Sequence, residues 1–413
     1  MLLKFSVDNY RSISAPQTIS LIAADPYLPS DHHLLGWPSK KAASVLPTAV
    51  IFGANASGKS NLIEAFELVQ LLIMQSHSLS GQAPLRTPFR LDPAKLKAPS
   101  VFVVDFVIDG VRYTYGFSLL DRVVLKEWLH YYPRGHRRIL FNRARRRITP
   151  SADLGGRKKV IADLTRSDSL YLSAGAQNGH QVLTKIHDYF ATWIADKPSF
   201  NAEPTISEHV AQHDLGRIIQ ILGDLDTGIV SFRKRRRKLG EKAQEFTREL
   251  DALFQTRFSS WKSIDLRDVP EIQLGHRGAL KEPTYFDLGD ESAGTQRLLP
   301  LLARALNALE KGSLLLVDEL DANLHTVACK MLVDLFRNEK INKKGAQIIA
   351  TTHDTNLLSM LAKEEVWFTE KQRTGGTYVY SLSDYRTKVG DPFEAGYLEG
   401  RYGAIPRPRL RVL

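Results

Sequence analysis

The chain has 413 residues, of which 43% are hydrophobic and 24% are charged, the composition of an ordinary globular protein. Its length predicts two or three domains, or one large α/β domain with an insertion. Because Cys329 is the single cysteine, the chain cannot form an internal disulfide framework. The sequence turns polar soon after Met1, unlike a signal peptide, and no apolar run is long enough to cross a bilayer. We therefore expect a cytoplasmic protein with no membrane partner, and the formal net charge of +11 favours polyanionic partners or a solvated basic surface.

The N-terminal part predicts short strands around one helix. Apolar and polar residues alternate over residues 2–9, which is the period of a half-buried strand. We expect a second strand at residues 18–23 and a proline-rich loop at 25–44. A continuous apolar run then predicts a strand at 48–52, and apolar residues at helical spacing predict a helix at 61–74. Because prolines punctuate residues 76–99, we expect that segment to be irregular.

The pattern then changes to a period of two residues, which predicts an antiparallel β-meander over residues 100–148. Strand patterns at 101–108 and 111–117 flank Asp109-Gly110, a strong hairpin-turn signal. Further strands are expected at residues 123–132, 138–142 and 169–173, followed by a helix at 182–194.

The rest of the chain predicts an insertion and then an α/β unit. Residues 208–225 and 239–258 are helix-forming and charged, so we expect a helical insertion over residues 179–268. Strands then alternate with helices, with strands expected at 272–274, 284–288, 313–317, 347–351, 365–369 and 377–382 and helices at 292–309, 326–336 and 356–361. Such alternation indicates an α/β fold with a mixed parallel core sheet covered on both faces.

The first residues that carry chemistry form the segment GANASGKS at 53–60, which matches the pattern G-x-x-x-x-G-K-[ST] between a predicted strand and helix. In that context the glycines let backbone N–H groups turn toward phosphate oxygens, and the helix N-terminus adds its positive dipole end. Lys59 can reach the β- and γ-phosphates, and the Ser60 hydroxyl can bind Mg²⁺. The residues expected to contact the nucleotide are Gly53, Asn55, Ala56, Ser57, Gly58, Lys59, Ser60 and Asn61.

Two carboxylates, Asp318 and Glu319, directly follow the apolar strand pattern at 313–317. The carboxyl end of a parallel strand is where an α/β sheet places its ligand site. Asp318 is therefore expected to hold Mg²⁺ together with Ser60, and Glu319 to polarise the attacking water.

Two further features lie in the same half of the chain. The turn ESAGTQ at 291–296 opens a helix, so it is either a second anion site or an ordinary N-cap with Ser292 as the capping residue. His353 follows the strand pattern at 347–351, where its side chain can donate a hydrogen bond to a γ-phosphate or serve a structural role.

Taken in chain order, the phosphate loop, the serine–glycine turn, the Asp–Glu pair, the segment DANLH at 321–325 and His353 resemble the motif set of ABC-class ATPase heads, as in SMC-type and OLD-type proteins. The start FSVDNYRS at 5–12 is similar to their first strand and turn. The segments ESAGTQ and YLEGRYGAIP, at 291–296 and 397–406, resemble more specifically the bacterial RloA/AbiL-type AAA ATPases, which accompany restriction and abortive-infection systems. The resemblance covers nearly the whole chain.

The resemblance implies catalytic roles at matching positions. Residues 53–60 would be Walker A, and Asp318 with Glu319 would be Walker B. Lys59, Glu319 and His353 would be the catalytic residues, with His353 as the switch histidine.

The resemblance also implies contacts made across subunits. The signature would act on the nucleotide of a second subunit through Ser292, Gly294 and Gln296. This signature reads SAGTQ, where transporters have LSGGQ. Asp321 would lie at the dimer seam, Gln177 would form a Q-loop that senses Mg²⁺, and Arg11 would approach the phosphate or the base.

Together these roles imply a Mg²⁺-dependent ATPase that forms an ATP-bound homodimer or a higher even oligomer. Each subunit would offer its signature to the γ-phosphate of its neighbour, and hydrolysis would open the dimer. The ATPase head would be split into halves at 1–178 and 269–413, on either side of the insertion. The dimer would sense a trigger or gate a separately encoded effector in anti-phage defence.

Two basic clusters are candidates for nucleic-acid contact, because runs of cations neutralise phosphates. One is the run of consecutive cations at 233–238, and the other, within 137–147, comprises Arg137, Arg138, Arg143, Arg145, Arg146 and Arg147. A solvated face or an acidic protein partner explains both clusters equally well.

Other functions stay open from the sequence alone. A DNA repair or maintenance ATPase that works directly on DNA is the main alternative, and DNA-stimulated hydrolysis would distinguish it. A single-chain OLD-type nuclease is disfavoured because only a short tail follows Ile405, and a transporter subunit is disfavoured by the meander and the insertion. A nucleotide-binding scaffold without turnover is disfavoured by Glu319 and His353.

Overall fold

The computed structural model describes residues 1–23, 34–36, 44–79, 86–196, 215–225, 227–237, 269–279, 281–388 and 390–406, with three isolated residues between 245 and 252. The chain divides into two compact units. The first comprises Met1–Ala202, Asn307–Ala322 and Cys329–Leu413, and the second comprises Glu203–Leu306 and Asn323–Ala328. The division predicted from the sequence, with a helical insertion at 179–268, places its borders elsewhere.

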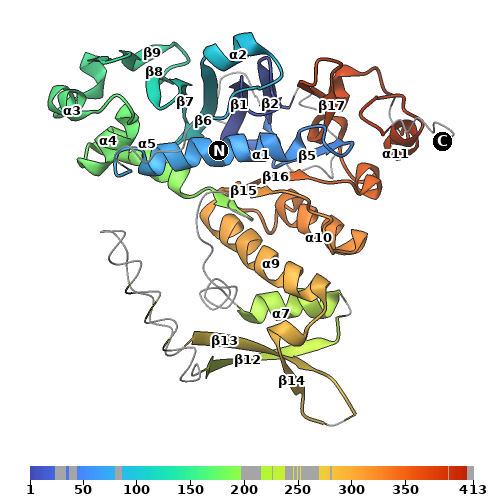
Figure 1. Cartoon of the computed structure of the whole chain (residues 1–413). Coiled ribbons are helices and arrows are strands. Elements are labelled where there is room, and N and C mark those ends of the chain that lie inside the picture. Colours follow the sequence, from blue (N-terminus) through green and yellow to red (C-terminus); the bar gives the residue numbers. More distant parts are fainter. Residues whose placement is uncertain are drawn as a thin grey trace. The chain divides into compact units, whose positions relative to one another are not determined.

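A six-stranded sheet of the first unit has the order β11-β15-β16-β5-β17-β18 (Figure 1). Its strands are β5 (Thr48–Gly53), β11 (Ile194–Ala195), β15 (Leu314–Val317), β16 (Gln347–Thr351), β17 (Val366–Lys371) and β18 (Thr377–Ser381). The strands from β11 to β17 run parallel, and β18 joins antiparallel at the edge. Every residue of β5, β15 and β16 is buried, which agrees with their continuous apolar runs and confirms the mixed parallel core sheet.

The second sheet of this unit is the predicted antiparallel meander, in the order β10-β9-β8-β7-β6-β1-β2. Its strands are β1 (Leu2–Asp8), β2 (Gln17–Ser20), β6 (Ser100–Ile108), β7 (Val111–Leu120), β8 (Val123–Tyr132), β9 (Arg138–Ala144) and β10 (Arg147–Pro150). Asp109 and Gly110 have φ values of 48° and 74°, as a two-residue turn with positive φ at both positions requires. A small two-stranded sheet pairs β3 (Leu35–Gly36) with β4 (Ser44–Val45).

Helices α1 (Lys59–Gln75), α4 (Tyr171–Gln177) and α5 (Gln181–Ala191) pack against one face of the meander (Figure 1). The ring pairs that join strands to these helices are Phe5–Phe66, Phe106–Tyr189 and Phe141–Tyr171, with centroids 3.7, 4.8 and 4.8 Å apart. Successive side chains of a strand point to opposite faces of the sheet, so the residues next to Phe5 on β1 point away from the core.

The remaining helices include one inside the segment that we expected to be irregular. There Asp92 accepts the N–H of Ala94 at 2.9 Å and so caps α2 (Pro93–Lys97). The other elements are α3 (Lys158–Leu164), α10 (Thr326–Arg337), α11 (Phe393–Leu398) and the 3₁₀ turns η1 (Ala152–Leu154), η3 (Thr355–Ser359), η4 (Lys363–Glu365) and η5 (Leu382–Asp384). Among the described residues, no helix is long and apolar enough to span a membrane.

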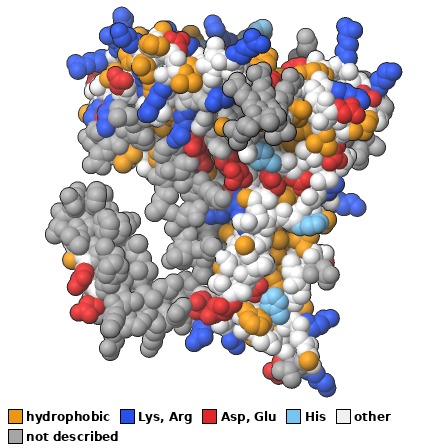
Figure 2. Space-filling view, turned by 45° about the vertical axis from the view of Figure 1, so that its right-hand side comes forward, with side chains coloured by type: hydrophobic (Ala, Val, Ile, Leu, Met, Phe, Trp, Pro, Cys, Tyr) orange, Lys and Arg blue, Asp and Glu red, His pale blue; other side chains and the backbone are white. Residues whose placement is uncertain are grey.

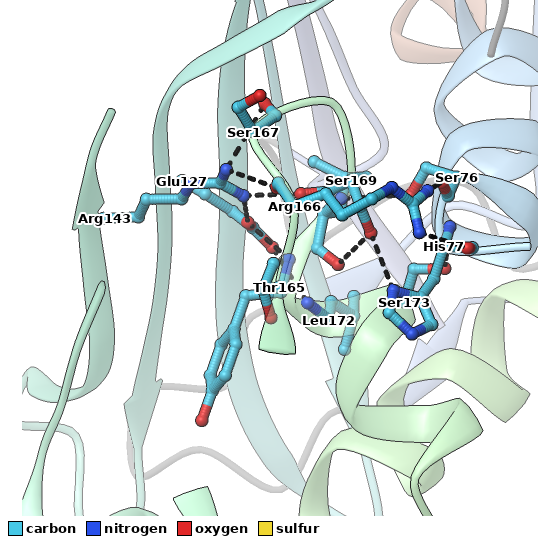
Figure 3. A network of polar contacts seen from close by, with 12 residues as sticks. Ser76, His77, Glu127, Arg143, Thr165, Arg166, Ser167, Ser169, Leu172 and Ser173 are labelled. Carbon is cyan, nitrogen blue, oxygen red and sulfur yellow. Dashed lines mark hydrogen bonds and ion pairs between the residues drawn. The ribbon is translucent and has the colours of Figure 1, made fainter. Parts of the chain in front are cut away.

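The prediction of a buried strand at residues 169–173 is wrong, because the chain forms helix α4 there (Figure 3). The carboxylate of Glu127, on β8, accepts the N–H groups of Tyr171 and Leu172 at 2.7 and 3.0 Å. A negative charge beside the first N–H groups of a helix stabilises its N-terminus. The helix therefore begins where a buried carboxylate from another element meets the chain, which an apolar pattern does not reveal.

Arg143 of β9, which we placed in a basic surface cluster, is in fact buried beside Glu127 (Figure 3). Both side chains are 0% exposed, and they form an ion pair of 3.5 Å. The guanidinium also donates to the carbonyls of Arg145, Ser169 and Arg166 at 2.7, 2.5 and 2.9 Å. Burial raises the pKa of Glu127, and the charge of Arg143 opposes that shift. Arg143 therefore belongs to the core of the fold.

The second unit contains α7 (Leu215–Asp224), β12 (Ile229–Arg237), β13 (Val269–His276), β14 (Thr284–Asp287), η2 (Leu288–Asp290) and the start of α9 (Ala293–Lys311). The strand β12 contradicts an entirely helical insertion, because residues 233–237 of the basic run lie on it, whereas Lys238 lies outside the described residues. β12 pairs antiparallel with β13, and Arg233 lies opposite Gln273, 40 residues later in the chain. That distant partner, and not local composition, makes the segment a strand. The helix predicted at 239–258 lies mostly outside the described residues.

Candidate functional site

The carboxyl ends of three neighbouring parallel strands bring the predicted motifs to one edge of the six-stranded sheet. β5 leads into the phosphate loop, β15 leads into Asp318 and Glu319, and β16 leads into Thr352 and His353. The registers of β15 with β16 and of β16 with β5 place these three ends side by side. This is the edge at which α/β sheets bind their ligands.

The phosphate loop has a tight backbone that its glycines allow. Gly58 has a φ of 108°, and a Cβ at this position would collide with the hydroxyls of Thr377 and Ser12. A Cβ at Gly53 would lie 2.5 Å from the backbone carbonyl oxygen of Thr369. Glycine is therefore required at both ends of the loop.

Hydroxyl groups that the sequence analysis missed fasten this loop from outside. Asn61 Nδ2 donates to Ser12 Oγ at 2.6 Å, Ser12 and Thr377 share a hydrogen bond of 2.7 Å, and Thr377 Oγ1 donates to the carbonyl of Ser57 at 2.7 Å. The hydroxyls of Ser57 and Thr369 share a further hydrogen bond of 2.6 Å. Ser12, Thr369 and Thr377 come from distant parts of the chain, so no motif marks them.

Lys59 is 6% exposed, and its ammonium donates to the carbonyls of Gly53 and Ala54 at 2.9 and 3.2 Å. Burial lowers the pKa of Lys59, and three nearby carboxylates act in the opposite direction: Asp318, Asp321 and Glu319. The loop therefore curls around a cation that faces the carboxylates from the end of β15. A lysine in this position is placed to meet phosphate oxygens.

Threonines at the end of β16 orient these carboxylates. Thr351 Oγ1 donates to Asp318 Oδ1 at 2.6 Å and accepts the N–H of Glu319 at 2.8 Å, and Thr352 Oγ1 donates to Asp321 Oδ1 at 2.8 Å. Both threonines are fully buried, so they position the acids and do not meet a ligand themselves. Glu319 has a φ of 53° and is exposed. Such a left-handed backbone at a non-glycine residue is a form of strain that clusters at functional sites.

His353 lies among the same charges. Its backbone N–H donates to Asp321 Oδ1 at 3.1 Å. Partial burial lowers the pKa of its imidazole and Lys59 adds to this effect, while three carboxylates oppose it: Asp321, Glu319 and Asp318. The ring is therefore neutral at neutral pH, and it has one N–H to donate.

We expect His353 in the protein without nucleotide to titrate below its usual value of 6.5. The neutral ring dominates above that midpoint, and protonation as the pH falls adds a charge near the Lys59 ammonium. Lys59→Met should therefore raise the midpoint, whereas the exposed-site control Lys344→Met should leave it unchanged. An NMR titration of the ring protons, assigned with His353→Gln, checks this. An unchanged midpoint in Lys59→Met would show that the two side chains are not close.

Gln177 does not join this site. Its amide donates to Ser78 Oγ at 2.7 Å, beyond the C-terminal end of α1. Lys59 lies at the other end of this 17-residue helix, about 25 Å away along its axis. The Q-loop prediction is wrong because Gln177 ends the helix α4 and does not follow a strand of the core sheet.

Arg11 precedes Ser12, which accepts a hydrogen bond from Asn61 directly after the phosphate loop. Its guanidinium forms an ion pair with Glu64 of α1. With Ser12 and Asn61 it lines a cavity of about 560 Å³, which Lys371 also borders. Cations around a cavity next to the loop suit an anionic ligand, so Arg11 stays a candidate for nucleotide contact.

The predicted signature lies in the second unit at the start of α9. Ser292 Oγ accepts the N–H of Thr295 at 3.1 Å, so Ser292 caps the helix. The amide of Gln296 donates to the carbonyl of Glu291 at 2.8 Å. Ser292 is exposed, whereas Gly294 and Gln296 are half-buried. The capping role is confirmed, and a contact between this turn and a nucleotide stays a prediction.

The oxygen donors of the site fit Mg²⁺ and a nucleotide. The Ser60 hydroxyl in the first turn of α1 and the Asp318 carboxylate are hard oxygen ligands of the kind that Mg²⁺ prefers. Mg²⁺ usually binds through one or two carboxylates together with substrate phosphates. Among the described residues, no group of three or more His, Cys, Asp and Glu side chains could hold a metal ion.

A protein-family model described as "AAA domain, putative AbiEii toxin, Type IV TA system" matches residues 49–359. The chain belongs to this AAA family. The matched region includes the phosphate loop, the Asp318–Glu319 pair and His353. A search of the curated proteins finds no match.

Among solved structures, the SMC head bound to the C-winged helix domain of ScpA has a TM-score of 0.41 and 14% identity, covering 95% of this chain and 99% of that one. The SMC head domain from Thermotoga maritima has a TM-score of 0.35 and 15% identity, covering 92% of this chain and 98% of that one. The strand order and registers of this chain define its fold.

Proposed function

We propose that this protein is a cytoplasmic, Mg²⁺-dependent ATPase of the RloA/AbiL type, whose ATP-bound homodimer senses a trigger or gates a separate effector in anti-phage defence. The observation that supports this most is the group of charges around the phosphate loop: Lys59, Asp318, Glu319, Asp321 and His353. The family description, which names an AbiEii toxin and a TA system, supports the defence setting.

The residues at the sheet edge have separate roles in hydrolysis. Backbone N–H groups of the loop and the ammonium of Lys59 bind the phosphates. Ser60 and Asp318 would hold Mg²⁺, which supplies charge neutralisation when bound. Glu319 is exposed at the end of β15, where it accepts a proton from the attacking water, and the neutral ring of His353 donates its N–H to the γ-phosphate. Catalysis on this plan consists of positioning and charge stabilisation.

The signature of each subunit completes the site of its neighbour, so bound ATP joins the two subunits. Hydrolysis then separates them, and the exchange between the two states is the signal that an effector reads. The second unit, which carries the signature turn, is the candidate surface for that effector.

A mixing experiment tests the shared site. Lys59→Met removes the phosphate-binding cation, and Ala293→Arg adds bulk to the exposed signature turn while Ser292 still caps the helix. Each variant alone should be nearly inactive, because each homodimer then lacks one part of both of its sites. Mixed in equal amounts they should recover roughly a quarter of wild-type turnover, because random pairing makes half of the dimers mixed and each mixed dimer has one intact site.

The control mixes Lys59→Met with the double variant Lys59→Met/Ala293→Arg, in which no intact site can form, and should recover nothing. If Ala293→Arg alone turns over ATP at the wild-type rate, the signature takes no part in hydrolysis. If each variant is inactive and mixing recovers nothing, the two parts of the site do not come from different subunits.

A further inference from the structure

The face of the meander turned away from α1, α4 and α5 presents aromatic and cationic side chains. We call this surface the outer face and define it by Arg112, Lys126, Trp128, His130, Tyr132 and Asn142. Their cross-strand registers place all six on the same side of β7, β8 and β9. All are half-exposed or exposed, whereas the alternate residues Leu129 and Phe141 are buried in the core.

Trp128 is the centre of the outer face. It lies opposite Gly116 on β7 and opposite Asn142 on β9. A Cβ at Gly116 would collide with the six-membered ring of Trp128, so the indole covers this glycine and lies against the sheet. Trp128 is nevertheless only half-buried, so part of its ring is open to solvent and to a planar partner.

Cations surround this ring. Lys126 is exposed one position along the same face of β8. Arg112 lies over the ring of Tyr132 at 4.6 Å, and it pairs with Asp105, the acidic residue beside it, at 2.6 Å. Arg137 is close enough to His130 to add to the effect of partial burial in lowering the pKa of that imidazole. The carboxylate of Asp105 is therefore neutralised by Arg112. Lys126 lies on one side of Trp128, and Arg137 lies near His130 on the other side.

The β9–β10 turn extends this positive surface. Ala144 pairs with Lys126 on one side and with Arg147 on the other, so the turn lies at the Lys126 end of the outer face. Arg145, Arg146 and Arg147 are all exposed there. Figure 2 shows Lys and Arg side chains projecting at several places along the upper margin of the molecule. The formal net charge of +11 adds a long-range attraction for polyanions.

We propose that the outer face binds single-stranded nucleic acid, with a base stacked on Trp128 and phosphates held by Lys126, Arg137 and the Arg145–Arg147 turn. Stacking on a side chain needs a base whose flat face is uncovered, which a single strand offers and a duplex does not. The cations supply the sequence-independent part of the affinity. This surface is separate from the phosphate loop, so the inference does not rest on the proposed ATPase activity.

Fluorescence anisotropy with the full-length protein tests this. The probes are labelled oligothymidylate, oligouridylate and a DNA duplex of the same length, over a range of salt concentrations. Measurements on wild type and on Lys59→Met, without nucleotide, separate this binding from ATP hydrolysis. Both proteins should bind at least one single strand more tightly than the duplex, and the two single-stranded probes identify DNA or RNA as the preferred ligand.

Substitutions on the outer face should weaken this binding selectively. Trp128→Ala should weaken single-strand binding by roughly 5- to 100-fold, and Trp128→Phe should retain most of it because a ring is still present. Lys126→Glu/Arg137→Glu should weaken binding and flatten its salt dependence. The charge-matched control Lys343→Glu/Lys344→Glu, in an exposed loop before β16, should have little effect.

Several outcomes would overturn the proposal. The first is that the protein binds none of the probes. The second is that it binds duplex and single strand with equal affinity and that Trp128→Ala has no effect. The third is that Lys126→Glu/Arg137→Glu and Lys343→Glu/Lys344→Glu lose equal amounts of affinity. Thermal unfolding of each variant shows whether it is folded. If Trp128→Ala does not fold, Trp128→Phe and the charge-reversed pair still decide the question.

Discussion

Replacing Glu319 with glutamine is expected to slow ATP hydrolysis by about 100- to 10,000-fold, because a general base contributes a factor of that size. Glu319 is exposed directly after β15, and its backbone N–H is held by the buried hydroxyl of Thr351. The amide keeps the size and position of the side chain, but it cannot accept a proton from water. The phosphate loop and Asp318 are unchanged, so ATP should bind as in the wild type.

The same variant should accumulate as an ATP-bound dimer. Phosphate release measures turnover, and light scattering with and without Mg-ATP measures solution mass. Glu310→Gln removes another exposed carboxylate, near the end of α9, and should behave as wild type in both assays.

Three results would count against this account of Glu319. Turnover of Glu319→Gln at the wild-type rate would remove this residue as the base. A monomer in the presence of Mg-ATP, for both proteins, would contradict the signature assignment. A dimer of constant mass without nucleotide would mean that ATP does not drive assembly, and that hydrolysis changes the arrangement inside an existing dimer.

Replacing Glu127 with alanine is expected to lower the free energy of unfolding by about 3–5 kcal/mol, the usual cost of removing one partner of a buried ion pair. Arg143 would then keep a buried charge that no carboxylate balances. The N–H groups of Tyr171 and Leu172 would also lose their acceptor at the start of α4. The hydroxyl of Tyr115, which donates to Glu127 at 3.0 Å, would lose its acceptor as well.

Urea unfolding of the full chain, followed by circular dichroism, measures this change. Glu399→Ala is the control, because it breaks the ion pair with Arg401 in which both side chains are more than half exposed. That control should cost less than about 1 kcal/mol, as surface ion pairs do. If the two variants unfold at the same urea concentration, the Glu127–Arg143 network does not stabilise the fold.

The sequence predicted the elements whose signal is local. The phosphate loop, the apolar strand before Asp318 and the Asp109-Gly110 hairpin each have a local residue pattern that indicates the structure they adopt. The same holds for β16, whose bounds at Gln347–Thr351 were predicted without error. From the order of these motifs along the chain we predicted an ABC-class ATPase, and the family match shows that the chain belongs to an AAA family.

Tertiary structure decided what depends on contacts between distant segments. Residues 171–177 form a helix because Glu127 from β8 meets their N–H groups, and β12 is a strand because β13 pairs with it. Strand pairing and carboxylate caps join residues far apart in the chain, so a local pattern carries no trace of them.

In the candidate site, too, some residues could be predicted from local sequence and others depend on tertiary contacts. The residues proposed to meet a ligand were predicted from the sequence, because phosphate chemistry requires particular side chains at fixed spacing. The residues that hold them in place, such as Ser12, Thr351 and Thr377, were not predicted. A hydroxyl positions a neighbour equally well from any element that folding brings within hydrogen-bonding distance. By itself, therefore, the sequence predicted which groups would perform the chemistry, and only the tertiary structure decided which groups orient them.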